Sequence, residues 1–162
     1  AKEWRLELVD SSVNRSLTAL EEREGPATFP RGWVRHAFHD MTLVGRASYL
    51  LKHADELGYR AFEETGRIFT ESFISMRDEL RVSRPEIDAA VETCLAHGAL
   101  GARIVGGGFG GAVMALVKTS RLEETAQAIA QAYAEHGYAE PRFLPMVAGF
   151  PADYDWLSEN FR

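Results

Sequence analysis

The sequence predicts an α+β domain in which helices pack against a mainly antiparallel sheet. Three observations support this class: helical periodicity over much of residues 33–97, two short apolar segments that flank a run of glycines, and an alanine-rich helical pattern after them. The predicted order of strand, helices, strand, strand, helix, strand corresponds to a ferredoxin-like βαββαβ sheet with extra helices in the first crossover. We assign residues 1–149 to this domain and residues 150–162 to a C-terminal tail.

The first half of the chain is predicted to be mostly helical. Residues Trp4–Val9 alternate between polar and apolar types, as a half-buried strand does. The stretch Glu21–Gly32 is charged and then rich in Pro and Gly, which predicts a loop. Apolar residues at helical spacing follow over Trp33–His53 and again over Gly58–Leu80, where Phe and Met residues mark the expected core face.

The second half predicts the remaining helices and strands. A third helix is expected over Ser83–His97, with its first serine as the N-cap of a capping box. The apolar segments Ala102–Val105 and Ala112–Val117 predict two strands, and the continuous apolar run of the second is typical of a buried one. Arg121–Glu135 predicts a helix that ends at a glycine, and Arg142–Val147 predicts the last strand.

Composition and charge exclude several classes of protein. The 162 residues carry a formal net charge of −6, which argues against a general binder of nucleic acid or anionic membranes. Cys94 is the single cysteine and lies among apolar helix positions, so we interpret it as a buried hydrophobe and exclude a disulfide within the chain. The chain shows neither a signal-peptide pattern nor an apolar run of about 20 residues. We therefore expect a cytoplasmic location.

The segment Gly106–Gly111 is the sharpest candidate for a functional site. Glycine occupies five of its six positions. Because glycine loses the most backbone entropy on folding, such a run is costly unless the backbone geometry requires it. Between two strands, such a run permits positive φ values and lets backbone N–H groups approach an anion. Two interpretations stay open: a loop that lines a phosphate or sugar site, and a strand connection packed tightly against a helix. A Walker loop and a Rossmann fingerprint are excluded, because neither the Gly-Lys-Ser/Thr ending nor the following helix is present.

Other candidate residues have weaker support. His36 and His39 are three residues apart on a predicted helix beside Asp40, a spacing compatible with metal binding. Two surface histidines are the favoured interpretation, and no metal site is predicted. Arg77 and Asp78 could hold a cleft together as a polar pair, or they could complement the dipole at the end of their helix.

Five stretches of the chain resemble galactokinase motifs and follow the same order. Ala102–Gly111 (ARIVGGGFGG) resembles the third motif of the GHMP small-molecule kinases in its galactokinase form. Glu71–Asp78 (ESFISMRD) resembles E-S-H-x-S-M-R-D, and Ser83–Asp88 (SRPEID) resembles S-x-P-E-[IL]-D. Arg35–Asp40 is similar to R-H-x-x-x-E, and Asp10–Leu17 (DSSVNRSL) to D-T-x-x-x-R-x-L. Ordered motifs are more specific together than any one of them alone.

This resemblance implies the C-terminal domain of an ATP-dependent sugar 1-kinase, which transfers a phosphoryl group from Mg-bound ATP to the C1 hydroxyl of galactose. In the family, ATP and sugar lie between two domains, and the N-terminal domain carries the catalytic groups. No catalytic residue is therefore expected in this chain, and the chain alone is expected to be inactive. By position, one loop would form a wall of the phosphate and substrate cleft: Gly106, Gly107, Gly108, Phe109, Gly110 and Gly111. Three residues could support that cleft: Ser75, Arg77 and Asp78.

The implied partners are the N-terminal kinase domain and a small sugar. The chain departs from the family at Phe73, Leu43 and Asp40, where His, Arg and Glu are usual. It also lacks the Tyr-Asn-x-Arg-Arg segment that supplies a sugar-contacting Tyr, so the identity of the sugar stays open. Two alternatives remain: a stand-alone, non-catalytic module that binds a sugar, a phosphate or a partner protein, and self-association through an exposed domain face.

Overall fold

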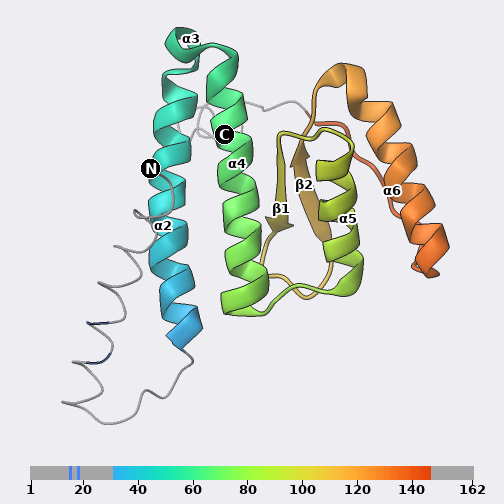
Figure 1. Cartoon of the computed structure of the whole chain (residues 1–162), viewed down its shortest axis with the longest axis horizontal. Helices are drawn as coiled ribbons and strands as arrows, with labels where there is room; N and C mark the ends of the chain where they lie inside the picture. The colour runs from blue at the N-terminus through green and yellow to red at the C-terminus, as the bar shows by residue number, and fades with distance from the viewer. Residues whose placement is uncertain (1–14, 16–17, 19–30, 147–162) are drawn as a thin grey trace, which may run out of the picture.

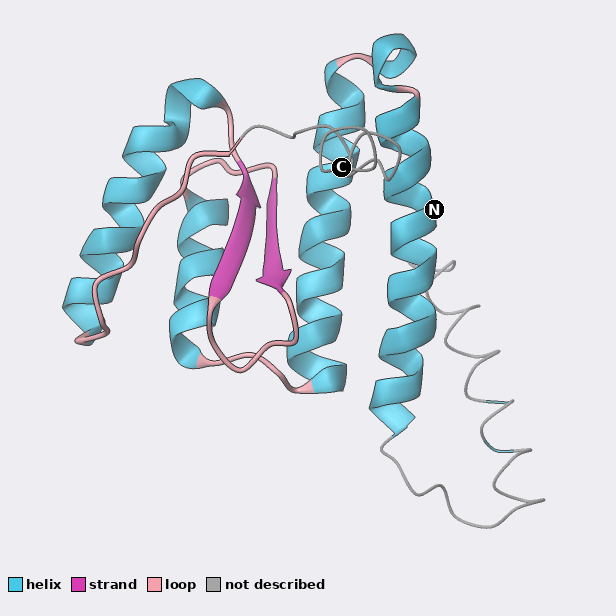
Figure 2. Cartoon of the chain, turned by 180° about the vertical axis from the view of Figure 1, so that it is seen from behind, coloured by secondary structure: helices cyan, strands magenta, loops and turns pink. Residues whose placement is uncertain are grey.

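The computed structural model describes residues 15, 18 and 31–146. In this part of the chain, helices α2 and α4 lie on one side of a two-stranded sheet, α6 lies on the other side, and α5 covers one face (Figures 1 and 2). The elements follow in this order: α2 (Arg31–Lys52), α3 (Ala54–Leu57), α4 (Tyr59–Ser75), a π-helical turn (Met76–Leu80), α5 (Pro85–Ala96), β1 (Gly101–Val105), β2 (Ala112–Leu116), a 3-10 turn (Thr119–Arg121) and α6 (Leu122–His136).

The sheet is a hairpin of two antiparallel strands. Gly101 of β1 lies opposite Leu116 of β2, and Val105 lies opposite Ala112. Residues 102 and 104 are both fully buried and belong to the main core. Arg103 between them points to the other face, as the period of two of a strand requires, and its guanidinium lies 3.7 Å from the carboxylate of Asp40 on α2. Because β1 runs downwards in Figure 1, the connection to β2 lies at the lower end of the domain.

Helix α4 packs against β1 without an intervening side chain. Gly66 of α4 and Gly101 of β1 face each other at this contact. A methyl group on Gly101 would overlap the backbone of Gly66, and one on Gly66 would overlap the backbone of Leu100. This contact therefore depends on two residues that have no Cβ atom, and it sets the distance between α4 and the sheet.

The hydrophobic core lies between the sheet, α5 and the end of α4. Cys94 is 2% exposed within it, and burial raises the pKa of its thiol to about 11, which confirms the prediction of a buried hydrophobe. Tyr133 of α6 donates a hydrogen bond of 2.7 Å to the carbonyl oxygen of Glu86, which fixes α6 to the start of α5. The core cluster consists of Phe73, Met76, Val82, Ile87, Ala90, Val91, Cys94, Ala102, Ile104 and Ile129.

The predicted helices and the two central strands are present with small shifts at their ends. Helix α2 begins at Arg31, inside the stretch predicted as a loop, and α5 begins at Pro85 after Arg84 as its N-cap. Ser83 is therefore not the cap: its hydroxyl donates instead to the carboxylate of Asp88 at 2.5 Å. The helix predicted to end at a glycine does so, because Gly137 closes α6 in the left-handed conformation with a φ of 70°.

The predicted first and last strands are not found among the described residues. Residues Arg142–Met146, the described part of the predicted last strand, form no strand. Leu144 and Met146 are 82% and 85% exposed, and Pro145 between them lacks a backbone donor, so this segment has neither buried side chains nor a complete ladder. The predicted strand Trp4–Val9 and the predicted tail 150–162 lie outside the described residues. The α+β class is confirmed, whereas the four-stranded ferredoxin-like topology is not.

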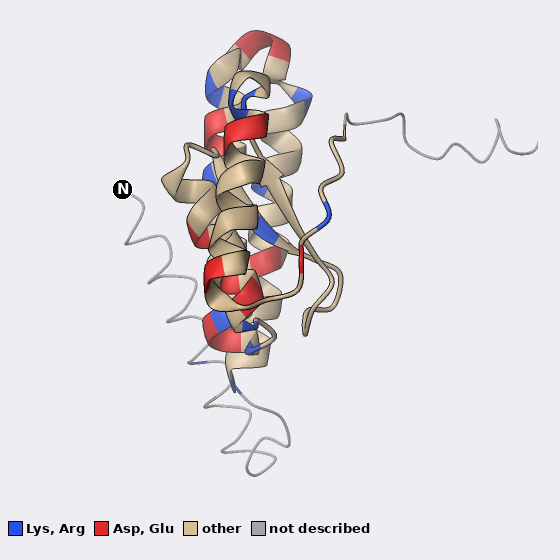
Figure 3. Cartoon of the chain, turned by 90° about the vertical axis from the view of Figure 1, so that its right-hand side faces the viewer, with Lys and Arg blue, Asp and Glu red and all other residues tan. Residues whose placement is uncertain are grey.

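Acidic and basic positions are interspersed along the helices (Figure 3). None of the helices in the described part of the chain is both long enough and apolar enough to span a membrane. Helix α2 exposes several apolar side chains on the side away from the core, including Phe38, Met41 and Val44, which are 53%, 72% and 57% exposed. The expectation of self-association through an exposed face stays a prediction.

Candidate functional site: the glycine loop

The connection between β1 and β2 has a backbone that ordinary residues rarely adopt. Four of its glycines have φ values between 79° and 126°. Phe109 also lies in the left-handed region, with a φ of 61°, although it carries a side chain. Gly107 is the one member of the loop outside this region. The glycines thus meet a conformational demand of the loop itself.

Most of this loop is open to solvent. A methyl group added to any of four glycines would meet no atom within 4 Å: Gly106, Gly107, Gly110 and Gly111. The Phe109 side chain is 64% exposed. The interpretation as a connection packed tightly against a helix therefore fails at four of the five glycines. The open backbone instead leaves room for a ligand to approach its N–H groups.

A single contact anchors the middle of the loop to the α4–α5 connection, residues 81–84. The backbone N–H of Phe109 donates a hydrogen bond of 2.7 Å to the carbonyl oxygen of Val82. Gly108 lies so close to Val82 that an added methyl group would overlap its side chain and lie 2.8 Å from its carbonyl oxygen. Val82 is in turn tied to the π-helical turn, because its N–H donates to the carbonyl oxygen of Met76 at 3.1 Å. The loop is thus fixed at its centre and open at both ends.

Arg77 and Asp78 form an ion pair with each other in the π-helical turn that leads to this connection. Arg77 donates two hydrogen bonds to the Asp78 carboxylate, at 2.7 and 3.2 Å. These bonds lower the pKa of Asp78 below its ordinary value and raise the pKa of Arg77. The guanidinium carbon of Arg77 also lies 5.5 Å from the centre of the Phe73 ring. The pair lies close in sequence to the loop anchor, and its role in a cleft stays a prediction.

Ser75 lies in the contact between α2 and α4. Its hydroxyl is 3.0 Å from Nδ1 of His36, and the serine is 8% exposed. One turn further along, Ser72 donates to the carboxylate of Asp40 at 2.7 Å, and that carboxylate lies 3.7 Å from Arg103 of β1. Polar contacts therefore fix α2 to α4 and to the strand that leads into the loop. The predicted role of Ser75 in support of a cleft stays a prediction.

His36 is half-buried and bonded to Ser75, so it differs from the surface histidine that was expected. Burial is the main influence on this side chain and lowers its pKa below the ordinary value of 6.5. Among the residues that the structure describes, no three His, Cys, Asp or Glu side chains are grouped to hold a metal ion.

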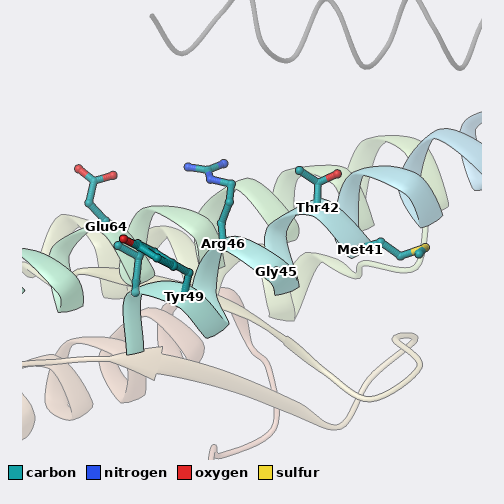
Figure 4. Close-up of a pocket in the computed structure, with 7 residues that line it drawn as sticks. Met41, Thr42, Gly45, Arg46, Tyr49 and Glu64 are labelled. Carbon is teal, nitrogen blue, oxygen red and sulfur yellow. The ribbon is translucent and has the colours of Figure 1, made fainter. Parts of the chain in front are cut away.

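A shallow hollow of about 500 Å³ lies on α2 and α4 (Figure 4), and no loop residue contributes to it. Its polar groups are partly engaged, since Arg46 donates to Glu71 at 3.0 Å. The hollow is open and mostly apolar, so it lacks the converging polar groups that a phosphate or sugar site needs. Its lining residues are Met41, Thr42, Gly45, Arg46, Tyr49, Leu50 and Glu64.

The described residues thus form an α+β domain whose two-stranded hairpin carries an exposed glycine loop. The sequence profile of the family described as "GHMP kinases C terminal" matches residues 35–139. Because this match covers more than half of the 162 residues, the chain belongs to that family.

Galactokinases are among the relatives of this chain. It is 39% identical over 131 residues to galactokinase of Streptomyces coelicolor, covering 81% of this chain and 32% of that relative. It is 39% identical over 108 residues to galactokinase of Mycobacterium tuberculosis, covering 67% and 29%. With galactokinase of Bos taurus the identity is 40% over 107 residues, covering 65% and 25%. The chain thus spans about a third of the length of these relatives or less.

Sequence reasoning overlooked the residue that anchors the loop. Val82 is a single apolar residue in a short connection, where no periodic pattern identifies a core position. Arg81 and Arg84 of the same connection were not among the predicted site residues, although Arg84 belongs to the predicted third helix. The contact with Gly108 and Phe109 joins segments more than 25 residues apart, and such a pairing has no signal in the spacing of either segment.

Proposed function

We propose that this chain is the C-terminal domain of an ATP-dependent sugar 1-kinase of the galactokinase type. The reaction is the transfer of a phosphoryl group from ATP to the C1 hydroxyl of galactose. The chain belongs to a kinase family, and its relatives are galactokinases, which supports the reaction class. The observation that carries the proposal is the glycine loop, which is anchored at Val82 and otherwise open to solvent.

The loop's contribution in this proposal is to orient phosphate. Phosphoryl transfer depends on positioning and on stabilisation of charge at the transferred group. Backbone N–H groups next to open glycines can approach phosphate oxygens without side-chain interference. The central anchor limits the movement of the loop, so a bound phosphate meets donors that are already in place. Ser72 and Asp40, through Arg103, hold β1 against α2 and α4 and so fix the position from which the loop starts.

The catalytic groups, ATP and Mg²⁺ are assigned mainly to the N-terminal domain. Among the described residues, no three His, Cys, Asp or Glu side chains are grouped as a set of metal ligands. When bound, Mg²⁺ would neutralise charge on the phosphates. The isolated chain is accordingly expected to be inactive, and the expected location is the cytoplasm.

A chimaera tests this proposal. The part of Streptomyces coelicolor galactokinase that matches this chain is replaced by residues 1–162, and phosphorylation of galactose and other hexoses is measured with Mg-ATP. We expect turnover by the chimaera and none by the chain alone. Calorimetry on the same samples checks sugar and nucleotide binding.

Two outcomes contradict the proposal. Robust turnover by the chain alone would contradict the assignment of the catalytic groups to the N-terminal domain. A folded chimaera that binds ATP but phosphorylates no hexose would overturn the kinase assignment, and sugar binding by the isolated chain would then favour a non-catalytic binding module.

A further inference from the structure

We propose that Arg81 and Arg84 form a cationic rim at the glycine loop and bind the phosphates of a polyanionic ligand, such as a nucleoside triphosphate. The inference rests on the proposed function, and it adds two side chains to a site otherwise formed by backbone groups. Both residues belong to the α4–α5 connection on which the loop is anchored. The loop and this connection lie side by side at the lower end of the domain (Figures 1 and 2).

The first argument is position. Val82, which accepts the hydrogen bond from Phe109 and packs against Gly108, lies directly after Arg81 and two residues before Arg84. Both arginines therefore lie on the segment that contacts the middle of the loop. An arginine on this segment can add positive charge to the site without occupying the room that the glycines leave free.

The second argument is charge. Both arginines are exposed, and neither has an ion-pair partner in the described part of the chain. The neighbouring charges are mostly engaged: Arg77 pairs with Asp78, and Glu79 pairs with Arg35. Asp88 accepts the hydrogen bond from Ser83, which leaves Glu86 as the remaining acid of the segment. Two exposed cations next to the open glycines place positive charge at the edge of the loop, which favours an anionic ligand there.

The third argument is backbone conformation. Two residues other than glycine have positive φ values in the described part of the chain: Arg81, with 59°, and Phe109, with 61°. They lie on either side of the hydrogen bond that joins the two segments. At Arg81 the left-handed conformation closes the π-helical turn. Phe109 has no such role, and backbone strain of its kind tends to collect at sites that bind ligands. A planar guanidinium matches phosphate oxygens with paired hydrogen bonds, so phosphate is the chemical class that fits both segments.

The test is a titration of the 162-residue chain with inorganic tripolyphosphate at low ionic strength, followed by the NMR signals of backbone amides. We expect the amides of residues 106–111 to shift. The double substitution R81Q/R84Q should raise the Kd about tenfold. The substitution R81K/R84K keeps the charge but removes the paired guanidinium hydrogen bonds, so its Kd should lie between those of the original chain and R81Q/R84Q. The matched control K52Q/R60Q removes two exposed cations near the opposite end of α4 and should leave the Kd unchanged.

Each outcome decides the inference. If the loop amides shift with equal Kd in the original chain and in R81Q/R84Q, the arginines have no part in the site, and the proposed function is unaffected. If R81Q/R84Q and K52Q/R60Q weaken binding equally, the effect is one of net charge, and the inference is wrong. If tripolyphosphate shifts no loop amide at all, the inference is also wrong, whereas the proposed function stands or falls on activity of the chimaera. A melting temperature for each variant confirms that it is folded.

Discussion

The glycines of this domain fall into two groups with opposite surroundings. Gly66 and Gly101 lie where α4 meets β1, and neither position has space for a methyl group. In the loop, Gly106, Gly107 and Gly110 have no atom within 4 Å of the place where a methyl group would be. The first pair is required by packing. The loop glycines are required by backbone conformation or by the approach of a ligand.

Because the surroundings of the two groups differ, stability and binding measurements can distinguish structural glycines from functional ones. Substitution of a glycine in a packed contact should cause a large loss of stability, and substitution of a glycine with a positive φ a moderate one. Substitution of a glycine that only leaves room for a ligand should weaken binding without a loss of stability. Because the three causes occur at different positions, single substitutions to Ala can distinguish them.

The largest effect is expected for Gly101→Ala. The added methyl group would overlap the carbonyl group of Gly66, so α4 and β1 must separate. We expect the free energy of unfolding to fall by about 3 kcal/mol in chemical denaturation. Alkylation of Cys94, which is 2% exposed, should become faster in the same variant, because the core opens more often. A loss below about 1 kcal/mol would show that the contact between helix and strand is looser than described.

A moderate and graded effect is expected within the loop itself. Gly108 and Gly110 both have positive φ values, 85° and 126°, but an added methyl group meets Val82 only at Gly108. Gly110→Ala should cost about 1 kcal/mol for the backbone conformation alone. Gly108→Ala should cost about 2 kcal/mol or more and should speed hydrogen exchange of the Phe109 amide. Equal costs for the two substitutions would contradict the anchor at Val82.

A smaller effect concerns the packed contact of α2 with α4. Burial lowers the pKa of His36 in the folded state below its ordinary value of 6.5, so the unfolded chain binds more protons in the interval between the two values. Stability should therefore decrease as the pH falls from about 7 through this interval. The variant His36→Gln should lose less stability between neutral and mildly acidic pH in denaturation experiments. An equal or larger loss in the variant would show that His36 is not the group responsible.

The sequence predicted the helices well and the buried face of α4 less well. Large apolar residues were expected to face the core, yet Phe62 is 40% exposed. Small or polar residues are buried instead, among them Ala61, Thr65 and Ser72. The reason is that α4 is covered on two sides, by α2 and by β1, and close approach on both sides favours small side chains. Periodicity of hydrophobic residues identifies one apolar face, and it does not detect a helix packed between two neighbours.

The candidate site could be predicted only in part. The glycine loop was evident from composition, because five glycines in six residues have few structural explanations. Its anchor at Val82 and the adjacent arginines depend on a contact between distant segments. No local pattern encodes that contact, so it became visible only in the folded chain.

The most direct test of the account is Gly107→Ala in the chimaera, with Gly45→Ala as the matched control. Both glycines have open surroundings and ordinary φ values, but Gly45 lies on α2, far from the loop in sequence. If loop glycines serve the approach of a ligand, Gly107→Ala should change the free energy of unfolding by less than about 0.5 kcal/mol. It should nevertheless lower kcat/KM at least about tenfold, whereas Gly45→Ala should leave kcat/KM unchanged. Full activity of Gly107→Ala would contradict the assignment of this loop to the phosphate site.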